Sequence, residues 1–360
     1  MTVFPPVLIA LFFWFVSGFA MAATPPGQGS PRSEGPPALA PHPGRRITLD
    51  VVVTDHEGKP VRGLQQQDFT LLDNKKLQTI LFFREAVGTG AAPDPSSQAI
   101  VVVDPVNNRF NRVSFQRVEL EKFLRQAVGP LPLPMSVVLL SDTYASSTAV
   151  TREGNTLADS LQANPIGLRT IFTWQGSSGG ADRTKVTLHA LEQLVASEVD
   201  QPGRKLIIWL GRGWPLLENS NFKLSKKDQE ACFQDIVWLS TKMREARITL
   251  DTIDQLGMDV GFGRSFYYKA FLGGVSSADK VQLNDLALQV FAVHSGGQVL
   301  NQSNDIGVAL ASCLEDAKNS YTLTFDSPPA GHADEYHSLQ VKINQPRLTV
   351  RTRTGYYAQP

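Results

Sequence analysis

Hydrophobic and polar positions follow two different patterns along this chain and divide it into three regions. In residues 46–86 and 318–357, short runs alternate apolar and polar residues, as strands with one buried face do; Leu339 to Ile343 is an example. In residues 99–317, continuous apolar runs alternate with segments that repeat apolar residues every three or four positions. This alternation predicts an α/β region with a doubly wound, mostly parallel sheet covered on both faces. Within it, Ser225 and Asp305 are predicted to cap the starts of two helices, and a further helix is expected around residues 283–290.

The two flanking β blocks contain only a few short strands each. Such units are marginally stable alone. We therefore predict that block 46–86 pairs with block 318–357 in one small β-sandwich, and that the α/β region 99–317 is inserted into it.

The apolar run that opens the α/β region ends in a carboxylate. Ile100 to Val103 are four consecutive β-branched residues, which favours a central strand buried on both faces, and Asp104 follows directly. Ligands of open α/β sheets bind at the carboxyl ends of such strands. The candidate binding surface consists of Asp104 and polar residues near it or after other predicted strands: Asn107, Asn108, Asp142 and Arg212.

The first 45 residues carry targeting signals rather than a fold. An apolar run from Val7 to Ala20 leads into small residues, which predicts a signal peptide over 1–22 with cleavage near Ala22. The run is shorter than the roughly 20 residues of a spanning helix, although no Lys or Arg precedes it. Residues 23–45 are rich in Pro, Gly and Ser and read as a disordered linker. We therefore expect a secreted or periplasmic protein without a stable membrane anchor after cleavage.

Net charge bears on the class of partner, and the cysteine content bears on disulfide formation. The 34 basic and 34 acidic residues cancel, so no global charge favours nucleic acid or an anionic membrane. Cys232 and Cys313 both fall on apolar stripes of predicted helices. Two buried free thiols and a single disulfide are both compatible with this placement.

Enzymatic motifs are weak. Residues 176–180, GSSGG, formally match G-x-S-x-G, but residues 175–181 are predicted to form a polar glycine loop rather than a strand-to-helix elbow. The six His residues are scattered without metal-ligand spacing, and no phosphate-binding loop is present. A secreted hydrolase that uses Asp104, Asp142 or Ser178 remains an alternative, as does a structural envelope component.

Several segments carry a family resemblance in their order along the chain. They are VVVTDHEGKPVRGLQQQDFTLLDN, AIVVVDPVNN, HSGGQVLNQSNDIGVAL, NSYTLTF and VRTRTGYYA. In this order the chain resembles a von Willebrand factor A domain, and more narrowly the VWFA-related domain of acidobacterial secreted proteins. The resemblance implies a von Willebrand A or Rossmann-like sheet with a metal-ion-dependent adhesion site after its first strand.

The implied metal site is degenerate in this sequence. The family pattern is Asp-x-Ser-x-Ser, a Thr from a later loop and an Asp after the fourth strand; Asp104, Asn108 and Thr184 match or replace three of these. Val106 offers no oxygen, and the fourth strand runs into Gly211 and Arg212 without an Asp. Mg²⁺ would therefore be held weakly, and no cofactor is expected.

Two other roles for Asp104 are open. Arg212 is predicted to lie within reach of Asp104 and to replace the cation. In the alternative, Asp104 only caps the turn that follows its strand.

The functional prediction is an exported, non-catalytic binding module that contacts a protein partner or an envelope component. The glycine-rich segment between Gly257 and Gly274 contains five aromatic residues: Phe262, Phe266, Tyr267, Tyr268 and Phe271. These rings could anchor a partner or pack beneath their own loop as a satellite cluster.

Overall fold

The computed structural model describes residues 45–86, 97–141, 145–164, 176–214, 224–254, 266–301 and 304–360, without the side chains of 176–178. These residues belong to one compact unit, Pro41–Pro360. The predicted signal peptide, and the linker up to residue 44, lie outside the described residues. Within the described ranges, no helix is both long and apolar enough to cross a membrane.

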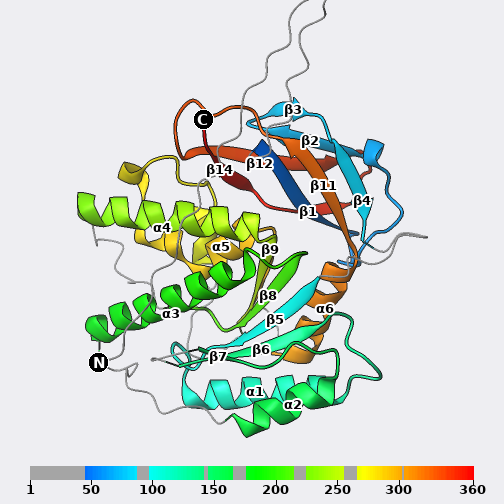
Figure 1. Ribbon diagram of the computed structural model, residues 1–360, viewed down its shortest axis with the longest axis vertical. Coiled ribbons are helices and arrows are strands. Elements are labelled where there is room, and N and C mark those ends of the chain that lie inside the picture. The colour runs from blue at the N-terminus through cyan, green and yellow to red at the C-terminus, as the bar shows by residue number, and fades with distance from the viewer. Residues whose placement is uncertain are drawn as a thin grey trace, which may run out of the picture. The chain divides into compact units, whose positions relative to one another are not determined.

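A six-stranded sheet forms the centre of the α/β region (Figure 1). Its spatial order is β10-β9-β8-β5-β6-β7. The strands are β5 (Gln98–Val103), β6 (Met135–Leu140), β7 (Ala145–Ser147), β8 (Lys205–Leu210), β9 (Ile248–Ile253) and β10 (Val299–Leu300). All pairs are parallel except β6 with the edge strand β7. Counted from β5, this is the order 3-2-1-4-5-6 of a doubly wound sheet.

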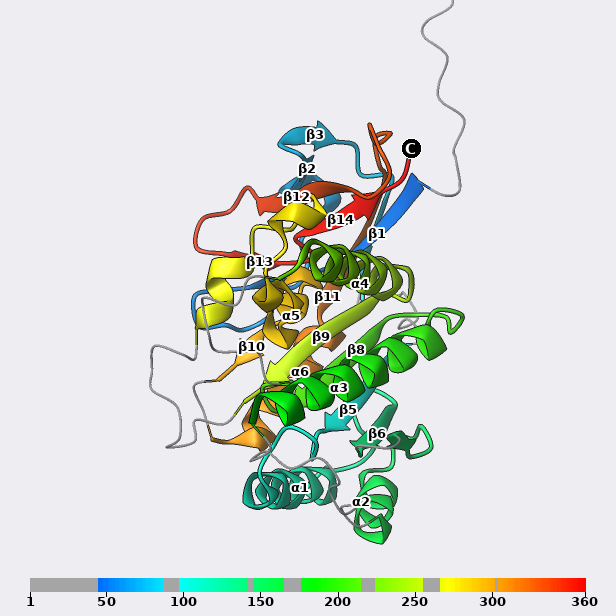
Figure 2. The same cartoon turned by 90° about the vertical axis from the view of Figure 1, so that its left-hand side faces the viewer.

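Helices cover both faces of this sheet (Figures 1 and 2). The helices are α1 (Phe110–Arg125), α2 (Gly154–Ala163), α3 (Gly176–Glu198), α4 (Lys226–Glu245), α5 (Leu288–His294) and α6 (Ile306–Lys318). Residues of α1, α2 and α6 pack in one apolar cluster, and residues of α3, α4 and α5 pack in the other.

The central strand β5 contributes to both apolar clusters. Val101 and Val103 belong to the cluster under α1, α2 and α6, whereas Ile100 and Val102 belong to the opposite one. Successive side chains of a strand point to opposite faces, so a strand buried on both sides needs a continuous apolar run. The run Ile100 to Val103 meets this need, and the predicted central strand is confirmed.

Two antiparallel sheets of four strands each make up the remainder, with orders β13-β1-β11-β4 and β14-β12-β2-β3. The strands are β1 (Arg46–Thr54), β2 (Phe69–Asp73), β3 (Lys76–Gln78), β4 (Phe82–Glu85), β11 (Ser320–Asp326), β12 (Glu335–Ile343), β13 (Thr349–Arg351) and β14 (Gly355–Ala358). In each sheet, strands from before the α/β region pair with strands from after it: β1 with β11, and β2 with β12. Their inward side chains share one apolar core.

Local capping signals in the sequence match the helix starts. Ser225 precedes α4 and accepts a hydrogen bond from Asp228 N at 3.2 Å, and Asp305 precedes α6 and accepts one from Val308 N at 2.9 Å. Such caps satisfy backbone N–H groups that lack partners within the helix. Both predicted caps are confirmed.

Two local predictions are wrong. The predicted glycine loop 175–181 is helical from Gly176, the first residue of α3. Glycine disfavours helix by about 1 kcal/mol per residue, but Leu191 and Val195 of the same helix are buried against the sheet, and this packing outweighs the local preference. The helix expected around residues 283–290 begins only at Leu288, after a 3₁₀ turn, Leu283–Leu286.

The structure decides between the alternatives left open for the two cysteines and for the aromatic residues of segment 257–274. Cys232 and Cys313 are free thiols, so the disulfide alternative is wrong; Cys313 is buried and Cys232 is half-buried. The four described aromatic residues pack with Ala287 and Val290 in a small cluster beside a 3₁₀ helix, Tyr267–Phe271. Phe262 lies outside the described residues. The described rings therefore form a satellite cluster. Shorter 3₁₀ turns occur at Gln66–Asp68 and Ala278–Lys280.

Candidate functional site

Asp104 lies where the strand order reverses. It follows β5, the first strand of the sheet, and the neighbouring strand β8 leads into Gly211 and Arg212. Chains that leave two adjacent strands toward opposite faces open a crevice at their carboxyl ends, where doubly wound sheets bind ligands. The topology thus selects this edge as the candidate site.

The Asp104 side chain is fully buried and receives hydrogen bonds from the protein itself. Its Oδ1 accepts from Asn107 N at 3.1 Å, and its Oδ2 accepts from Asn107 Nδ2 at 2.8 Å. Trp209 Nε1, from the buried strand β8, donates to the same Oδ2 at 3.2 Å. The capping interpretation of Asp104 is therefore confirmed, since its carboxylate closes the turn after β5.

Burial dominates the electrostatics of Asp104. Loss of solvent raises the pKa of its carboxyl, while the hydrogen bonds from Asn107, Trp209 and the Val106 backbone act in the opposite direction. Arg183 of α3 carries a positive charge that interacts with the charge of Asp104. Burial lowers the pKa of the Arg183 guanidinium, and the charge of Asp104 opposes that fall. The charge of Asp104 therefore acts on the Arg183 guanidinium.

Asn108 fixes the backbone on the same edge. Its Nδ2 donates to Asp104 O at 2.8 Å, and the side chain is buried. The amide lies against Gly211, where an added Cβ would come within 2.4 Å of Nδ2, and the φ of Gly211 is +128°. Only glycine combines this backbone conformation with such a close approach. Asn108 is therefore a structural bridge between the ends of β5 and β8.

The threonine that joins the Asp104 turn is not the predicted one. Thr184 lies within α3 rather than in a loop, and its Oγ1 donates to Gly180 O at 3.0 Å. One turn later, Thr187 Oγ1 accepts from Asn107 Nδ2 at 2.9 Å. Thr187 therefore belongs to the hydrogen-bond network around Asp104.

Arg212 pairs with an acid that follows β9, and the predicted Asp104–Arg212 pair is corrected. Arg212 Nε lies 2.9 Å from Asp254 Oδ2, and Arg112 Nη1 of α1 lies 3.0 Å from Asp254 Oδ1. Gln289 Nε2 holds the Arg212 backbone by donating to its O at 2.8 Å. The physical reason is accessibility: Asp104 is fully buried, whereas Asp254 lies close enough to the surface to meet a side chain that is 40% exposed.

The residues on this edge do not fit a divalent cation. The Asp104 carboxylate already accepts bonds from Asn107 and Trp209, and Asn108 presents its Nδ2, a donor, to the Asp104 backbone. Asp254, the acid nearest the end of a neighbouring strand, is neutralised by two guanidinium groups. Mg²⁺ requires several oxygen ligands with free lone pairs. Within the described residues, no group of three or more His, Cys, Asp or Glu side chains could hold a metal.

Two candidate residues from the sequence lie outside the described part of the structure. Asp142 is outside the described residues, as is the side chain of Ser178. Sequence reasoning missed Thr187, Arg183 and Asp254. Arg183 and Thr187 are spaced by four residues on one helix face, and Asp254 directly follows an apolar strand as Asp104 does. Those local signals mark positions on an edge, but they do not specify contacts.

Comparisons with known proteins add little to this geometry. No protein-family model matches the chain, and no curated protein matches it. One similar solved structure is that of the conserved hypothetical protein BatB from Bacteroides thetaiotaomicron, with 10% identity and a TM-score of 0.32. The similarity covers 61% of this chain and 98% of that one. At this TM-score the similarity does not indicate a function.

Proposed function

We propose that this chain is an exported, non-catalytic, von Willebrand A-like binding module whose partner presents an acidic group to Arg212. The supporting frame is the six-stranded sheet of order 3-2-1-4-5-6 with Asp104 after its first strand. In metal-dependent members of such a family, a cation receives the partner's carboxylate. Here a guanidinium would receive it directly.

The observation that carries the proposal is the arrangement of Arg212. Its Nε is bound to Asp254, which fixes the guanidinium plane, while its two terminal nitrogens have no hydrogen bond to the described part of the chain. A guanidinium held in this way presents a planar pair of donors that matches a carboxylate. With Arg112 on the same acid, the pair of arginines leaves an excess positive charge at the switch point.

The non-catalytic part of the proposal rests on the condition of Asp104. A general acid or base must reach a substrate proton, and Asp104 is fully buried under donors of its own chain. We expect the purified chain to be inactive on general esterase and protease substrates. The Asp104→Ala variant should show the same lack of enzymatic activity. Turnover that disappears in Asp104→Ala would favour the hydrolase alternative.

A pull-down from the protein's own envelope fraction tests the binding role. The unmodified chain should retain a partner equally with and without a chelator, because no cation is required. Arg212→Glu should abolish retention, since it reverses the charge that meets the partner.

Arg125→Glu is the matched control. Arg125 is likewise a partly exposed arginine bonded to carboxylates, Glu121 and Asp159, but it lies on α1 near α2. Retention by Arg125→Glu and loss in Arg212→Glu are expected. Equal retention by both variants, or loss on adding chelator, contradicts the proposal.

A further inference from the structure

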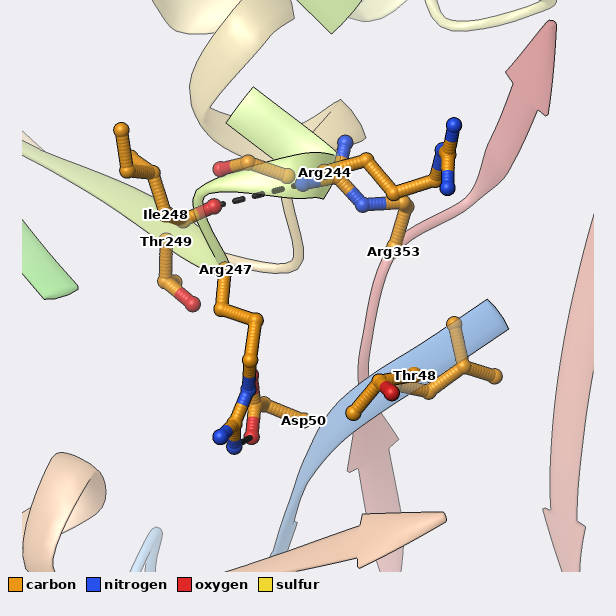
Figure 3. A pocket seen from close by; sticks show the side chains of 9 residues that line it. Thr48, Asp50, Arg244, Arg247, Ile248, Thr249 and Arg353 are labelled. Carbon is orange, nitrogen blue, oxygen red and sulfur yellow. Dashed lines mark hydrogen bonds and ion pairs between the residues drawn. The ribbon is translucent and has the colours of Figure 1, made fainter. Parts of the chain in front are cut away.

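A second polar site lies at the opposite ends of the strands, between β1 and the start of β9. Six residues define what we call the arginine pocket: Asp50, Arg244, Arg247, Thr249, Ser295 and Arg353. Figure 3 labels five of them, which come from β1, from the end of α4 and the start of β9, and from the segment before β14; Ser295 directly follows α5. The pocket holds about 240 Å³ of space not filled by atoms, part of it open to solvent.

The residues that line this pocket include three guanidinium groups and one carboxylate. Arg247 Nη2 lies 2.6 Å from Asp50 Oδ1, and this is the short ion pair drawn in Figure 3. Among the described residues, Arg244 forms a long ion pair with Glu245, whose Oε1 is 3.8 Å from Arg244 Nη2; Glu245 also bonds Lys242. Positive charge therefore exceeds negative charge among the residues that line the pocket.

Of the three guanidinium groups, that of Arg353 is the most unfavourable to bury. It is 7% exposed, and it donates hydrogen bonds to two backbone carbonyls, Ser240 O at 3.4 Å and Ile248 O at 3.3 Å. Burial, with the like charge of Arg244, lowers the pKa of Arg353 to about 9, so the group stays cationic at neutral pH. A buried cation without an acidic partner is strongly unfavourable unless another anion accompanies it.

A nitrogen among the residues that line the pocket lacks a partner in the described part of the chain. Arg244 Nε is buried and has no hydrogen-bond partner among the described residues. A buried donor that lacks an acceptor destabilises the fold. An anion in the pocket would meet this donor and reduce the repulsion between Arg244 and Arg353 together.

We propose that the arginine pocket binds a chloride-sized inorganic anion between Arg244 and Arg353. Its enclosed part has room for about one water-sized particle, so the smallest inorganic anions are the occupants that fit it best. The anion supplies the negative charge that Asp50 alone does not, and it thereby joins strand β1 and the segment before β14 to the α4–β9 junction. This site is independent of the partner site at Arg212.

Thermal unfolding of the full chain tests the proposal. At constant ionic strength, replacing gluconate by chloride should raise the melting temperature saturably, by about 2 to 5 °C once chloride exceeds its dissociation constant tenfold. Arg353→Gln and Arg244→Gln should lose at least half of this rise. Asp50→Asn should enlarge it, because removing the only carboxylate in the pocket increases the demand for an anion. Arg125→Gln, outside the pocket, should respond as the unmodified chain does.

Crystals soaked in bromide provide the direct measurement. An anomalous peak between Arg244 and Arg353 is expected in the unmodified chain and absent in Arg244→Gln. If the Arg353 variant fails to fold, the Asp50→Asn response and the bromide peak still decide. A chloride response that is the same in every variant, or a pocket without bromide, overturns the proposal.

Discussion

Asp104 has the position of a ligand-binding residue but a structural role. Its position after β5 suggested chemistry, but burial and the bonds from Asn107 and Trp209 give it a structural role. His294 is a second residue whose environment alters its acid–base behaviour. Burial lowers the pKa of His294 to about 4, and the charge of Arg353 acts in the same direction.

Removing the Asp104 carboxylate should destabilise the fold. Asp104→Ala leaves the donors of Asn107 and Trp209 without an acceptor, which should lower the free energy of unfolding by roughly 2 to 4 kcal/mol. Urea denaturation followed by tryptophan fluorescence measures it. Asp159→Ala is the control, because Asp159 is an exposed ion-pair partner of Arg125 and should cost under about 1 kcal/mol. An equal free energy of unfolding in the two variants would refute the structural role of the Asp104 carboxylate.

His294 should make stability sensitive to mild acid. Its folded pKa lies below the unfolded value of 6.5, so the unfolded chain binds the proton first as pH falls. The stability contributed by neutral His294 is complete above pH 6.5 and is lost as pH falls toward 4, by up to about 3 kcal/mol. The difference in unfolding free energy between the unmodified chain and His294→Gln should shrink over that window. His332→Gln, at an exposed imidazole, should keep a parallel profile throughout.

At the scale of elements, close approach between strands and turns decides which residues are tolerated. The turn after α5 brings Gly297 against β9, where an added Cβ would lie 2.0 Å from Leu250 O and 2.6 Å from Asp251 Oδ1. Both obstacles belong to the buried sheet, one of them to its backbone. The segment that leads into β10 can therefore pair with β9 only if this position has no side chain.

Gly297→Ala should disrupt the β9–β10 pairing. The clash with a strand carbonyl should lower the free energy of unfolding by roughly 2 to 4 kcal/mol. Gly273→Ala is the matched control, because nothing lies within 4 Å of its added Cβ. Urea denaturation of both variants measures the difference, and comparable midpoints would contradict the close packing of Gly297.

At the scale of the whole molecule, the two ends of the chain build one β-sandwich around the inserted α/β region. Strand β1 lies between β11 and β13, β2 lies between β12 and β3, and β4 pairs with β11, so three of the four N-terminal strands have a C-terminal neighbour. The core of the sandwich draws on both blocks, with Leu49 and Leu71 from the first and Leu323 and Phe325 from the second. Neither block has a complete set of partners alone.

A chain that ends at Asn319 should therefore fail to form the sandwich. Removal of β11 to β14 exposes the edges and apolar faces of β1 and β2, which favours aggregation. Size-exclusion chromatography should show aggregated or insoluble protein. Deletion of the exposed residues 359 and 360 is the control and should leave a folded chain. A soluble, cooperatively unfolding product that ends at Asn319 would show that block 46–86 folds independently.

Local sequence was sufficient for much of the fold. The run before Asp104 predicted a strand buried on both faces, and Ser225 and Asp305 predicted two helix starts, because pleat, periodicity and capping depend on residues close together in the chain. It failed at residues 176–180, where packing of α3 on the sheet overrides the helix-breaking tendency of glycine.

The candidate site depended on tertiary structure. The sequence by itself determined that Asp104 and Arg212 both follow buried strands, and therefore that both lie on the carboxyl edge of the sheet. Only the tertiary structure decided that Arg212 meets Asp254, that Thr187 rather than Thr184 joins the Asp104 turn, and that Arg353 is buried beside Arg244. Periodicity reports which face a residue occupies, whereas a hydrogen bond or ion pair requires two distant segments to meet within about 3 Å. That meeting is set by how helices and strands pack.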